Sequence, residues 1–206
     1  GISVSLALLI GIPIGLKAAK KRNGAFDKFV NVFTMICVSI FVPFLSFGLL
    51  YIFSYTLKWL PTGGAYNPPP AQGFAYILDV AKHAILPALA LMLSNCTSII
   101  LYTRNSMLDV SKEDYIRTAR MKGWDDRYIT RKHAMRNAMI PTVTATSLMV
   151  TKMVGGAIMT ETIFSWPGVG RMIYDSVSSL DYPVLQGTFL LLAITAVIVN
   201  IITDII

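Results

Sequence analysis

The side chains that could carry chemistry in this sequence are few and lie far apart. Asp79 and His83 stand four residues apart, a spacing that places an acid and an imidazole on one face of a helix. Cys37 and Cys96 lie inside apolar stretches without the spacing of a metal site or a disulfide framework. We interpret Asp79 and His83 as a surface pair and the cysteines as small buried hydrophobes. No catalytic residue, metal site or cofactor is predicted.

Lys152 is the one charge well inside a long apolar stretch. A charge at membrane depth is costly, so it normally faces the interior of a helix bundle or a watery cavity. Lys152 is therefore a candidate for lining a translocation path. The alternatives are that its amine reaches the membrane surface, or that it pairs structurally with Glu161 or Asp204.

Nucleotide chemistry is not expected of this chain. The sequence contains no G-x-x-x-x-G-K-[ST] phosphate loop. The glycines of PGVG at 167–170 are no substitute, because no Lys-Ser/Thr pair accompanies them; they are typical of a turn before a short helix. The sequence does not predict an enzyme.

The composition of the chain indicates which kind of structural element must carry these residues. The chain has 206 residues, of which 54% are hydrophobic and 14% charged, and its mean hydropathy is +0.61. Such a chain is not an ordinary soluble domain. Four stretches are long and apolar enough to cross a bilayer: 29–57, 84–103, 138–160 and 182–203. We predict an all-α, polytopic membrane helix bundle.

The first residues form a fifth, partial span. Residues 1–16 are apolar but a little short, and they begin with Gly, so we interpret the chain as truncated at its N-terminus, with about five spans present. A signal peptide is the alternative, but the basic residues follow this apolar run instead of preceding it.

Charge placement predicts the orientation. Five basic residues lie at 17–28 and nine at 104–136, which leaves four elsewhere among the eighteen. The positive-inside rule makes those two loops cytoplasmic. The net charge of +7 does not indicate nucleic-acid binding, because the basic residues alternate with apolar spans and form no separate basic domain.

The outer loop at 60–73 contains Pro61, two glycines and three consecutive prolines, which exclude regular helix. A short helix is expected to resume at 74–84. Four further prolines stand in or at the ends of spans and are interpreted as packing kinks: Pro13, Pro43, Pro87 and Pro141.

The cytoplasmic loop predicts two helices joined at a glycine. Ser111 and Asp114 have the spacing of a capping box, which predicts a helix over 112–122. Gly123 can adopt the left-handed conformation that ends a helix. Asp125 or Asp126 would then begin a second helix that continues toward Pro141.

The second helix has the pattern of an interface. Three of its apolar side chains, Tyr128, Met135 and Met139, fall on one line along the helix. Basic residues lie on both sides of that line. This pattern suits a helix at the membrane surface or in a protein groove. The alternative is a basic loop that serves only to anchor the topology.

Several long motifs resemble one transporter family. Residues 115–123 read YIRTARMKG and residues 133–141 read HAMRNAMIP, which together resemble the cytoplasmic loop of binding-protein-dependent ABC importer permeases. The likeness is to the oligopeptide/dipeptide/nickel branch. Residues 11–28 (GIPIGLKAAKKRNGAFDK), 161–175 (ETIFSWPGVGRMIYD) and 181–187 (DYPVLQG) are similar to other parts of the same branch. In the wider superfamily a Glu-Ala-Ala triplet precedes the glycine, and here Arg117, Thr118 and Ala119 stand in those slots, as is common in this branch.

The resemblance implies a fold and a mechanism. It implies one permease domain over 1–206 with the type I importer fold, a coupling loop at 104–140, and a first membrane helix upstream of Gly1. In that family the helix before the glycine docks in a groove of a cytoplasmic ATPase. The residues carried over to that ATPase-coupling interface are Tyr115, Ile116, Arg117, Thr118, Ala119, Arg120, Met121, Lys122 and Gly123.

The resemblance also implies partners and a cargo. The expected partners are ATP-binding subunits, a second permease subunit or a second copy of this chain, an extracytoplasmic substrate-binding protein and the lipid bilayer, with no nucleic acid. The implied function is import of oligopeptides or dipeptides across a prokaryotic cell membrane. Nickel import is the alternative within the branch, although intramembrane His or Cys clusters, which would favour metal, are absent from the sequence pattern. A secondary transporter fits less well.

The orientation can be tested by cysteine accessibility. In a background without Cys37 and Cys96, single cysteines at Asn23 and Gly123 are expected to react with an impermeant thiol reagent only from the cytoplasmic side. A cysteine at Gly64 is expected to react only from outside, because the basic loops stay inside. Labelling of the Gly64 position from the cytoplasm would contradict the assignment.

Overall fold

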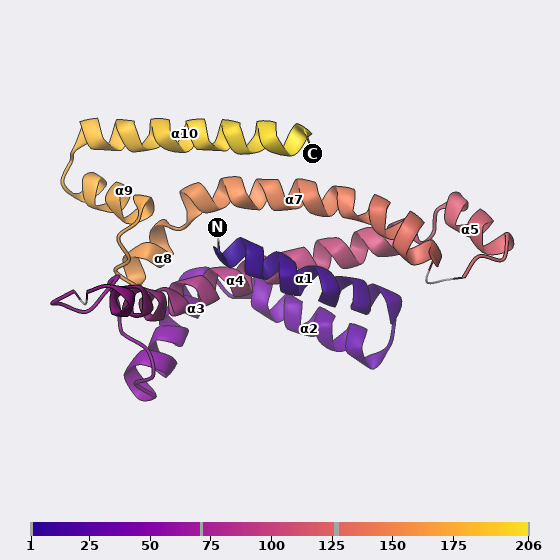
Figure 1. Ribbon diagram of the computed structural model, residues 1–206, viewed down its shortest axis with the longest axis horizontal. Helices are drawn as coiled ribbons and strands as arrows, with labels where there is room; N and C mark the ends of the chain where they lie inside the picture. Colours follow the sequence, from indigo (N-terminus) through magenta and orange to yellow (C-terminus); the bar gives the residue numbers. More distant parts are fainter. Residues whose placement is uncertain (1, 71, 126–127, 206) are drawn as a thin grey trace.

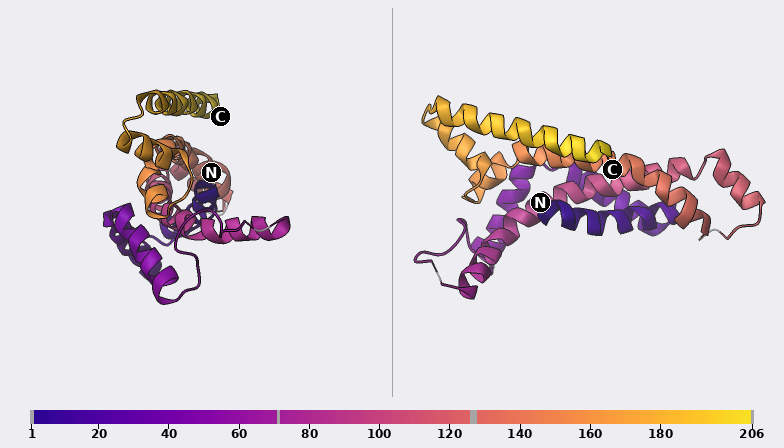
Figure 2. Two further views of the ribbon diagram at one scale, coloured as in Figure 1. Left: turned by 90° about the vertical axis from the view of Figure 1, so that its left-hand side faces the viewer. Right: turned by 45° about the horizontal axis from the view of Figure 1, so that its top comes forward.

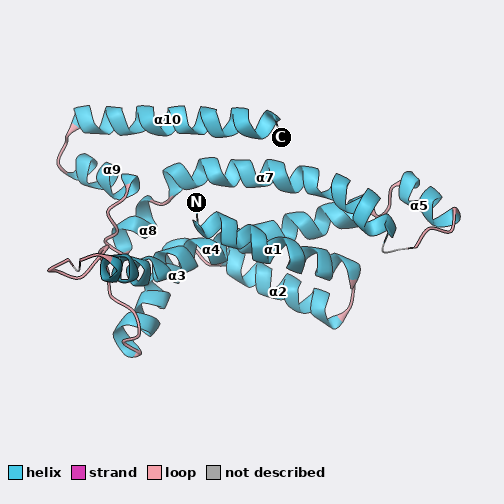
Figure 3. Ribbon diagram, in the orientation of Figure 1, coloured by secondary structure: helices cyan, strands magenta, loops and turns pink. Residues whose placement is uncertain are grey.

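The computed structural model describes residues 2–70, 72–125 and 128–205, and the side chains at 148, 150–156 and 203–205 lie outside that description. The regular structure of these residues is helical (Figure 3). The elements, of which η1 and η2 are π-helical, are α1 Ile2–Lys20, α2 Ala25–Ser39, α3 Val42–Leu49, η1 Leu50–Thr56, α4 Phe74–Val110, α5 Asp114–Met121, η2 Ile129–Ala134, α7 Met135–Gly156, α8 Ile158–Ile163, α9 Val169–Ser178 and α10 Tyr182–Ile205.

The helices form an elongated bundle. The α1, α2, α4, α7 and α10 helices run along its length, with α5 and the α1–α2 turn toward one end (Figures 1 and 2). The outer loop at 57–73 lies toward the other end with α8 and α9 (Figure 1). The two basic segments, 17–28 and 104–136, therefore face the same end, as the charge pattern predicts. We call it the basic end.

The predicted uninterrupted span at 29–57 is wrong. The chain bends by 97° between α2 and the α3–η1 segment. Ile40 and Phe41 are extended at the bend, and a proline occupies the first turn of α3. Pro43 has no backbone donor and a fixed φ, so it starts a helix readily and continues one poorly. Pro43 therefore marks a break in a span.

The long α4 helix merges two predicted elements. The expected short helix at 74–84 and the expected span at 84–103 are one helix of 37 residues that continues to Val110. At 1.5 Å per residue it is about 55 Å long, which exceeds the ~30 Å hydrocarbon core. Pro87 lies inside it without ending it. Residues 104–110, expected in a loop, are thus the end of α4 that lies at the basic end of the bundle.

Three helices meet the length and hydropathy expected of a membrane span, namely α1, α4 and α10, and the bent α2–α3 pair is a fourth candidate among the described residues. The predicted span at 138–160 ends earlier, because α7 stops at Gly156 and α8 begins after Ala157. The α10 helix runs beside α7, and only 6% of its most apolar window is buried (Figure 1).

Small residues bring α1 and α4 together. A Cβ added to Gly11 would lie 2.9 Å from Ile99 Cγ2, and one added to Gly15 would lie 2.9 Å from the Ile100 carbonyl oxygen. Ala7, one turn earlier on the same face, is fully buried. A stripe of small residues at four-residue spacing lets two membrane helices approach closely. Lipid is itself apolar, so the hydrophobic effect does not drive helices together there, and the dispersion contacts of close packing hold them instead.

A buried ion pair joins α2 to α4 at the basic end. Arg104 donates from Nε to Asp27 Oδ1 at 2.6 Å and from its Nη2 atom to Asp27 Oδ2 at 2.9 Å. The Asp27 side chain is 2% exposed, and it also accepts from the Asn23 backbone N–H at 3.0 Å. This bidentate geometry is the strong form of a carboxylate–guanidinium contact. The sequence pattern had indicated only a topological role for Arg104.

Breaking this pair should destabilise the fold. Asp27→Asn leaves the Arg104 guanidinium buried without a counter-charge, which costs about 3–5 kcal/mol. Denaturant unfolding of the purified protein in detergent would measure the loss. The exposed Lys112–Asp109 pair is the matched control, since Asp109→Asn should cost less than about 1 kcal/mol. Equal effects of the two substitutions would contradict a special role for the buried pair.

Candidate functional site

The α5 helix at the basic end has well-defined termini. Glu113 is its N-cap residue, and Asp114 in the first turn is favourable to the helix dipole. At the other end, Gly123 has φ +76, its N–H bonds to the Arg120 carbonyl at 2.9 Å, and the Trp124 N–H bonds to the Ala119 carbonyl at 3.4 Å. These two bonds form a Schellman motif. The predicted role of Gly123 as the end of the helix is confirmed.

The predicted capping box is wrong. Ser111 is the C-cap of α4, and its hydroxyl donates to the Met107 carbonyl at 2.6 Å instead of to α5. The α5 helix makes no side-chain cap bond at its N-terminus and starts at Asp114, two residues after the predicted start. A serine hydroxyl can bond backward to the preceding turn as well as forward, so the sequence spacing does not decide between them.

Two residues of the predicted interface face inward. Ile116 is 1% exposed and Ala119 is 6% exposed. Both belong to a core cluster formed with residues of the following helix: Ile129, Ala134 and Ala138, together with Ala19 and Met107. Ile116 and Ala119, in the middle of the predicted coupling segment, therefore pack α5 against the rest of its own chain.

The π-helical turn η2 sets which residues face α5. Residues five apart align in a π turn, so Ile129 and Ala134 lie on one face, which Ala138 continues in α7. The line of Tyr128, Met135 and Met139 predicted from α-helical spacing is not the buried one. The alanines let α5 approach closely. Because η2 passes directly into α7, the predicted continuation toward Pro141 is confirmed and extends to Gly156.

Aromatic and polar contacts complete this unit. The Trp124 ring stacks on His133 with centroids 5.2 Å apart, and Tyr128 meets His133 edge-on at 5.9 Å. Asn137 Nδ2 donates to the Tyr115 hydroxyl at 2.8 Å. These contacts fix the segment after α5 against η2 and α7. Asp126, one of the two predicted caps, lies outside the described residues, and the Asp125 carbonyl accepts from the Ile129 N–H at 3.0 Å.

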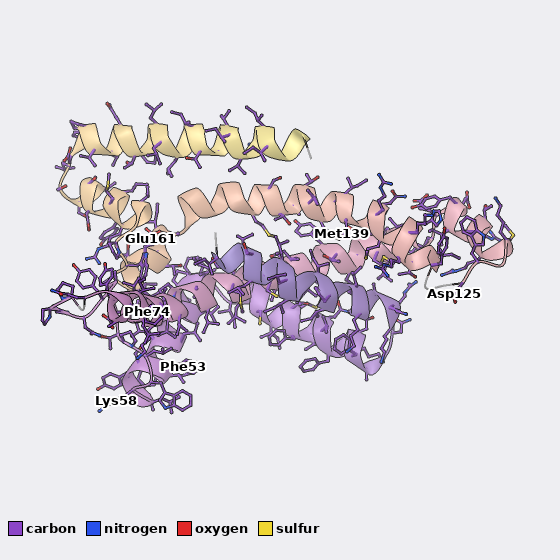
Figure 4. All side chains as sticks on the ribbon, viewed as in Figure 1. Phe53, Lys58, Phe74, Asp125, Met139 and Glu161 are labelled. Carbon is purple, nitrogen blue, oxygen red and sulfur yellow. The ribbon has the colours of Figure 1, made fainter. Side chains whose placement is uncertain are left out.

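The outward face of α5 is mixed basic and apolar. Met121 is 74% exposed, and Tyr115 and Trp124 are about two fifths exposed. Four further members of the predicted interface are exposed: Arg117, Thr118, Arg120 and Lys122. The α5 helix lies at one end of the bundle (Figure 1), and Asp125 is labelled close to it in Figure 4.

A groove of about 800 Å³ lies in the middle of the bundle. It opens between the α2–α3 break, α4, α7 and α8, and Phe41 and Pro43 at the break form part of its wall. Hydroxyl and carboxamide groups line it alongside apolar side chains: Ser94, Asn95, Ser98, Tyr102, Thr144 and Thr160. None of its described lining residues is charged. The groove therefore offers neutral hydrogen-bonding groups at the depth of the spans.

The remaining candidate residues take different positions. The Lys152 side chain lies outside the described side chains, as does that of Asp204, one of its two possible partners. His83 is buried, not on the surface as predicted, and Asp79 holds the outer loop by accepting two bonds from Asn67, at 2.7 Å and 2.8 Å. In the described part of the chain, no three His, Cys, Asp or Glu side chains cluster as metal ligands would.

At the opposite end of the bundle, Glu161 packs against the glycines of residues 167–170, and we call this contact the clasp. Glu161 of α8 accepts from the Arg171 N–H in the first turn of α9 at 3.1 Å (Figure 4). A Cβ at Gly168 would collide with the Glu161 carboxylate, and one at Gly170 would lie 2.6 Å from Ile158 Cα. The PGVG glycines thus let the chain close around a carboxylate at the start of α9, which confirms the predicted turn before a short helix.

Together these features define a multi-pass membrane component with a protruding helix at one end and a polar groove within the bundle. Residues 11–206 match the family described as the binding-protein-dependent transport system inner membrane component. The chain belongs to that family, and it is an inner-membrane protein with several spans.

Curated relatives agree with this assignment. The chain is 39% identical over 201 residues to a peptide permease protein of Brucella suis, covering 98% of this chain and 62% of that protein. It is 38% identical over 206 residues to the oligopeptide transport system permease protein AppB of Bacillus subtilis, covering 99% of this chain and 64% of that protein. The chain thus spans less than two thirds of the length of these relatives.

A solved structure shares the fold. The chain aligns with a chain of the MetNI methionine ABC transporter, in an inward-facing conformation, with a TM-score of 0.71 and 18% identity. The alignment covers 98% of this chain and 87% of the other. This likeness confirms the predicted all-α importer permease fold.

The clasp gives a steric prediction. Gly170→Ala should destabilise the protein by about 1–3 kcal/mol, because the added methyl group would lie 2.6 Å from the Ile158 Cα atom and the backbone there cannot give way as a flexible side chain can. Gly187→Ala in α10 is the control, since a Cβ there meets nothing within 4 Å and alanine favours a helix. Denaturant unfolding in detergent checks both. Gly168→Ala should cost less than Gly170→Ala, because its methyl group meets only the end of the flexible Glu161 side chain. A loss from Gly170→Ala no larger than that from Gly187→Ala would contradict the steric argument.

Proposed function

We propose that this chain is the membrane-spanning translocation subunit of an ATP-driven, binding-protein-dependent importer of oligopeptides or dipeptides. The observation that carries the proposal is the attachment of α5 to α7. The α5 helix packs through Ile116 and Ala119 on the cytoplasmic extension of the helix that lines the central groove. A force on α5 would therefore reach the groove through one continuous helix.

The coupling interface is the outward face of α5. Tyr115, Met121 and Lys122 are exposed and available to a partner, whereas Ile116 and Ala119 hold α5 on its own chain. Basic side chains around an exposed methionine suit a helix that seats in a groove of another protein. We assign to Ile116 and Ala119 the transmission of movement, and to the exposed members of 115–122 the contact with the ATPase.

ATP would be bound by a partner subunit, because the sequence lacks a phosphate loop. The proposed assembly contains cytoplasmic ATP-binding subunits, a second permease subunit or a second copy of this chain, and an extracytoplasmic substrate-binding protein. The central groove, with its hydroxyl and carboxamide lining, is the proposed translocation surface. Lys152 remains a proposed lining residue, on the argument that a charge at membrane depth normally faces a bundle interior or a watery cavity.

Peptide is a better match to this groove than nickel. A peptide of variable sequence presents repeated amide donors and acceptors, which neutral groups such as Asn95 and Ser98 can bind without selecting a charge. Nickel favours imidazole, and His83 and His133 lie outside the groove lining, one near each end of the bundle. The names of the relatives, which are those of peptide permeases, support the same choice.

The coupling proposal is tested with two glycines of matched environment. Gly123 and Gly73 both have positive φ, +76 and +65, and a Cβ on either meets nothing within 4 Å. Valine at either position is strained by about 1–3 kcal/mol. Gly123→Val is expected to abolish uptake of a labelled peptide in liposomes containing the assembled complex. The complex should either still hydrolyse ATP without transport or fail to retain its ATPase subunit. Gly73→Val, at the opposite end, should leave uptake coupled.

Two further variants sharpen the same assay. Ala119→Trp has no room against α7, so it should displace α5 and uncouple transport while the protein still inserts. Lys152→Met should change uptake without changing assembly, if Lys152 lines the path. Normal uptake by both Gly123→Val and Ala119→Trp would refute the coupling assignment, and unchanged uptake by Lys152→Met would make that residue structural.

A further inference from the structure

A second groove lies between α1 and α2 at the basic end. It encloses about 470 Å³ and has an apolar lining that includes Ile14 from α1, Phe29 and Phe33 from α2, and Ile100 from α4. Phe29 is 67% exposed and Phe33 is 43% exposed, with their rings stacked at 6.2 Å. This groove is separate from the central one and shares none of its lining residues.

One end of this groove carries a cation. Lys17 lines the groove near the α1–α2 turn, and its Nζ atom sits 5.0 Å from the centroid of the Phe26 ring. The ring positions the amine through a cation–π contact, which leaves the ammonium hydrogens free to bind an anion. The groove thus has a charged end at the turn and an apolar length that leads away from it.

The surrounding charge is strongly positive. Lys20, Lys21 and Arg22 follow Lys17 in the last turn of α1 and the turn after it. The one acidic residue of this segment, Asp27, is already bound by the Arg104 guanidinium through both oxygens. No free carboxylate in this described segment competes for Lys17. An anionic group entering the groove would therefore meet an uncompensated positive potential.

The dimensions match a lipid. The wall from Phe26 to Phe33 covers eight residues of α2, and the seven steps between them span about 10 Å at 1.5 Å per residue. One leaflet contributes about half of the ~30 Å hydrocarbon core, so the wall follows roughly two thirds of an acyl chain's depth. A basic site between membrane helices on the cytoplasmic side is a recognised form of anionic lipid site.

We propose that the α1–α2 groove binds an anionic phospholipid, with its phosphate on Lys17 and one acyl chain along Phe29, Phe33 and Ile14. This charge complementarity distinguishes lipid from a covering protein helix, whose apolar face would leave the Lys17 ammonium without a counter-charge. The bound lipid adds a contact between α1 and α2, beside the α4 helix that carries Arg104.

The test uses the complete permease purified from vesicles of phosphatidylcholine and phosphatidylglycerol in equal parts. Native mass spectrometry counts the lipids retained. The wild-type protein should retain phosphatidylglycerol in preference to phosphatidylcholine. Lys17→Gln should lower that preference about fivefold, the effect of one basic residue near an anionic surface. Lys17→Arg should keep it. Lys28→Gln, also exposed at the basic end but outside the groove lining, is the matched control.

A second variant fills the groove without changing charge. Ile14→Trp should expel the acyl chain and lower retention of both lipids, with Lys17 intact. Equal retention of the two lipids by the wild-type protein would overturn the proposal, as would the same loss from Lys28→Gln as from Lys17→Gln. If a cysteine at Phe33 cross-links to another protein segment in the assembled complex, the groove is covered by protein and the lipid assignment is wrong.

Discussion

The uninterrupted α4 helix is the constraint on which the rest of the bundle depends. Hydrocarbon offers no hydrogen bonds, so a chain that crosses it must satisfy its backbone internally. The 37 residues of α4 do this over a length greater than the bilayer core, and α1, α2, α3, α7 and α8 all pack on it. Where other elements break, as between α2 and α3, the broken backbone faces a groove against α4 instead of standing alone.

Two kinds of contact attach the other helices to α4. Along α1 the attachment is steric, because Gly11 and Gly15 permit backbone approach. At the basic end it is electrostatic, because Asp27 and Arg104 satisfy each other away from water. The first sets the distance between helices and the second sets their register, since a bidentate pair tolerates little sliding. The α1–α2–α4 group thereby forms one body at the end where α5 protrudes.

Local signals in the sequence predicted local structure well. Gly123 ends α5 because only a residue that tolerates positive φ can close a Schellman motif, and that requirement is visible in the sequence. The PGVG turn before α9 and the helical class of the whole chain were predictable for similar reasons. The family motifs also singled out the segment around α5, whose direct contacts with an ATPase stay a prediction.

Features that depend on distant partners, or on a local choice that the spacing leaves open, were not predictable. Nothing near Ser111 indicates that its hydroxyl bonds backward, and the apolar run at 29–57 hides a bend that Pro43 only permits. The pairing of Arg104 with Asp27 joins positions 77 residues apart, which no local pattern reveals. Ile116 and Ala119 were expected to face a partner because they are apolar, yet the same property equally suits packing on their own chain.

The π turn at Ile129–Ala134 makes the connection from α5 to the groove depend on the geometry of the turn as well as on its residues. A π turn accommodates one residue more than an α turn, and each residue of an α-helix contributes a rotation of about 100°. If the same residues closed into regular α geometry, Ile129 would lie about 140° around the helix from Ala134 instead of on the same face. Either α5 would lose its seat, or Thr144 and Met149 would rotate away from the groove. Removing one residue within the turn would restore the alignment, because residues four apart share a face of an α-helix. The extra residue and the π geometry are therefore needed together, and a substitution that favours a regular α turn here would be more harmful than the loss of one residue.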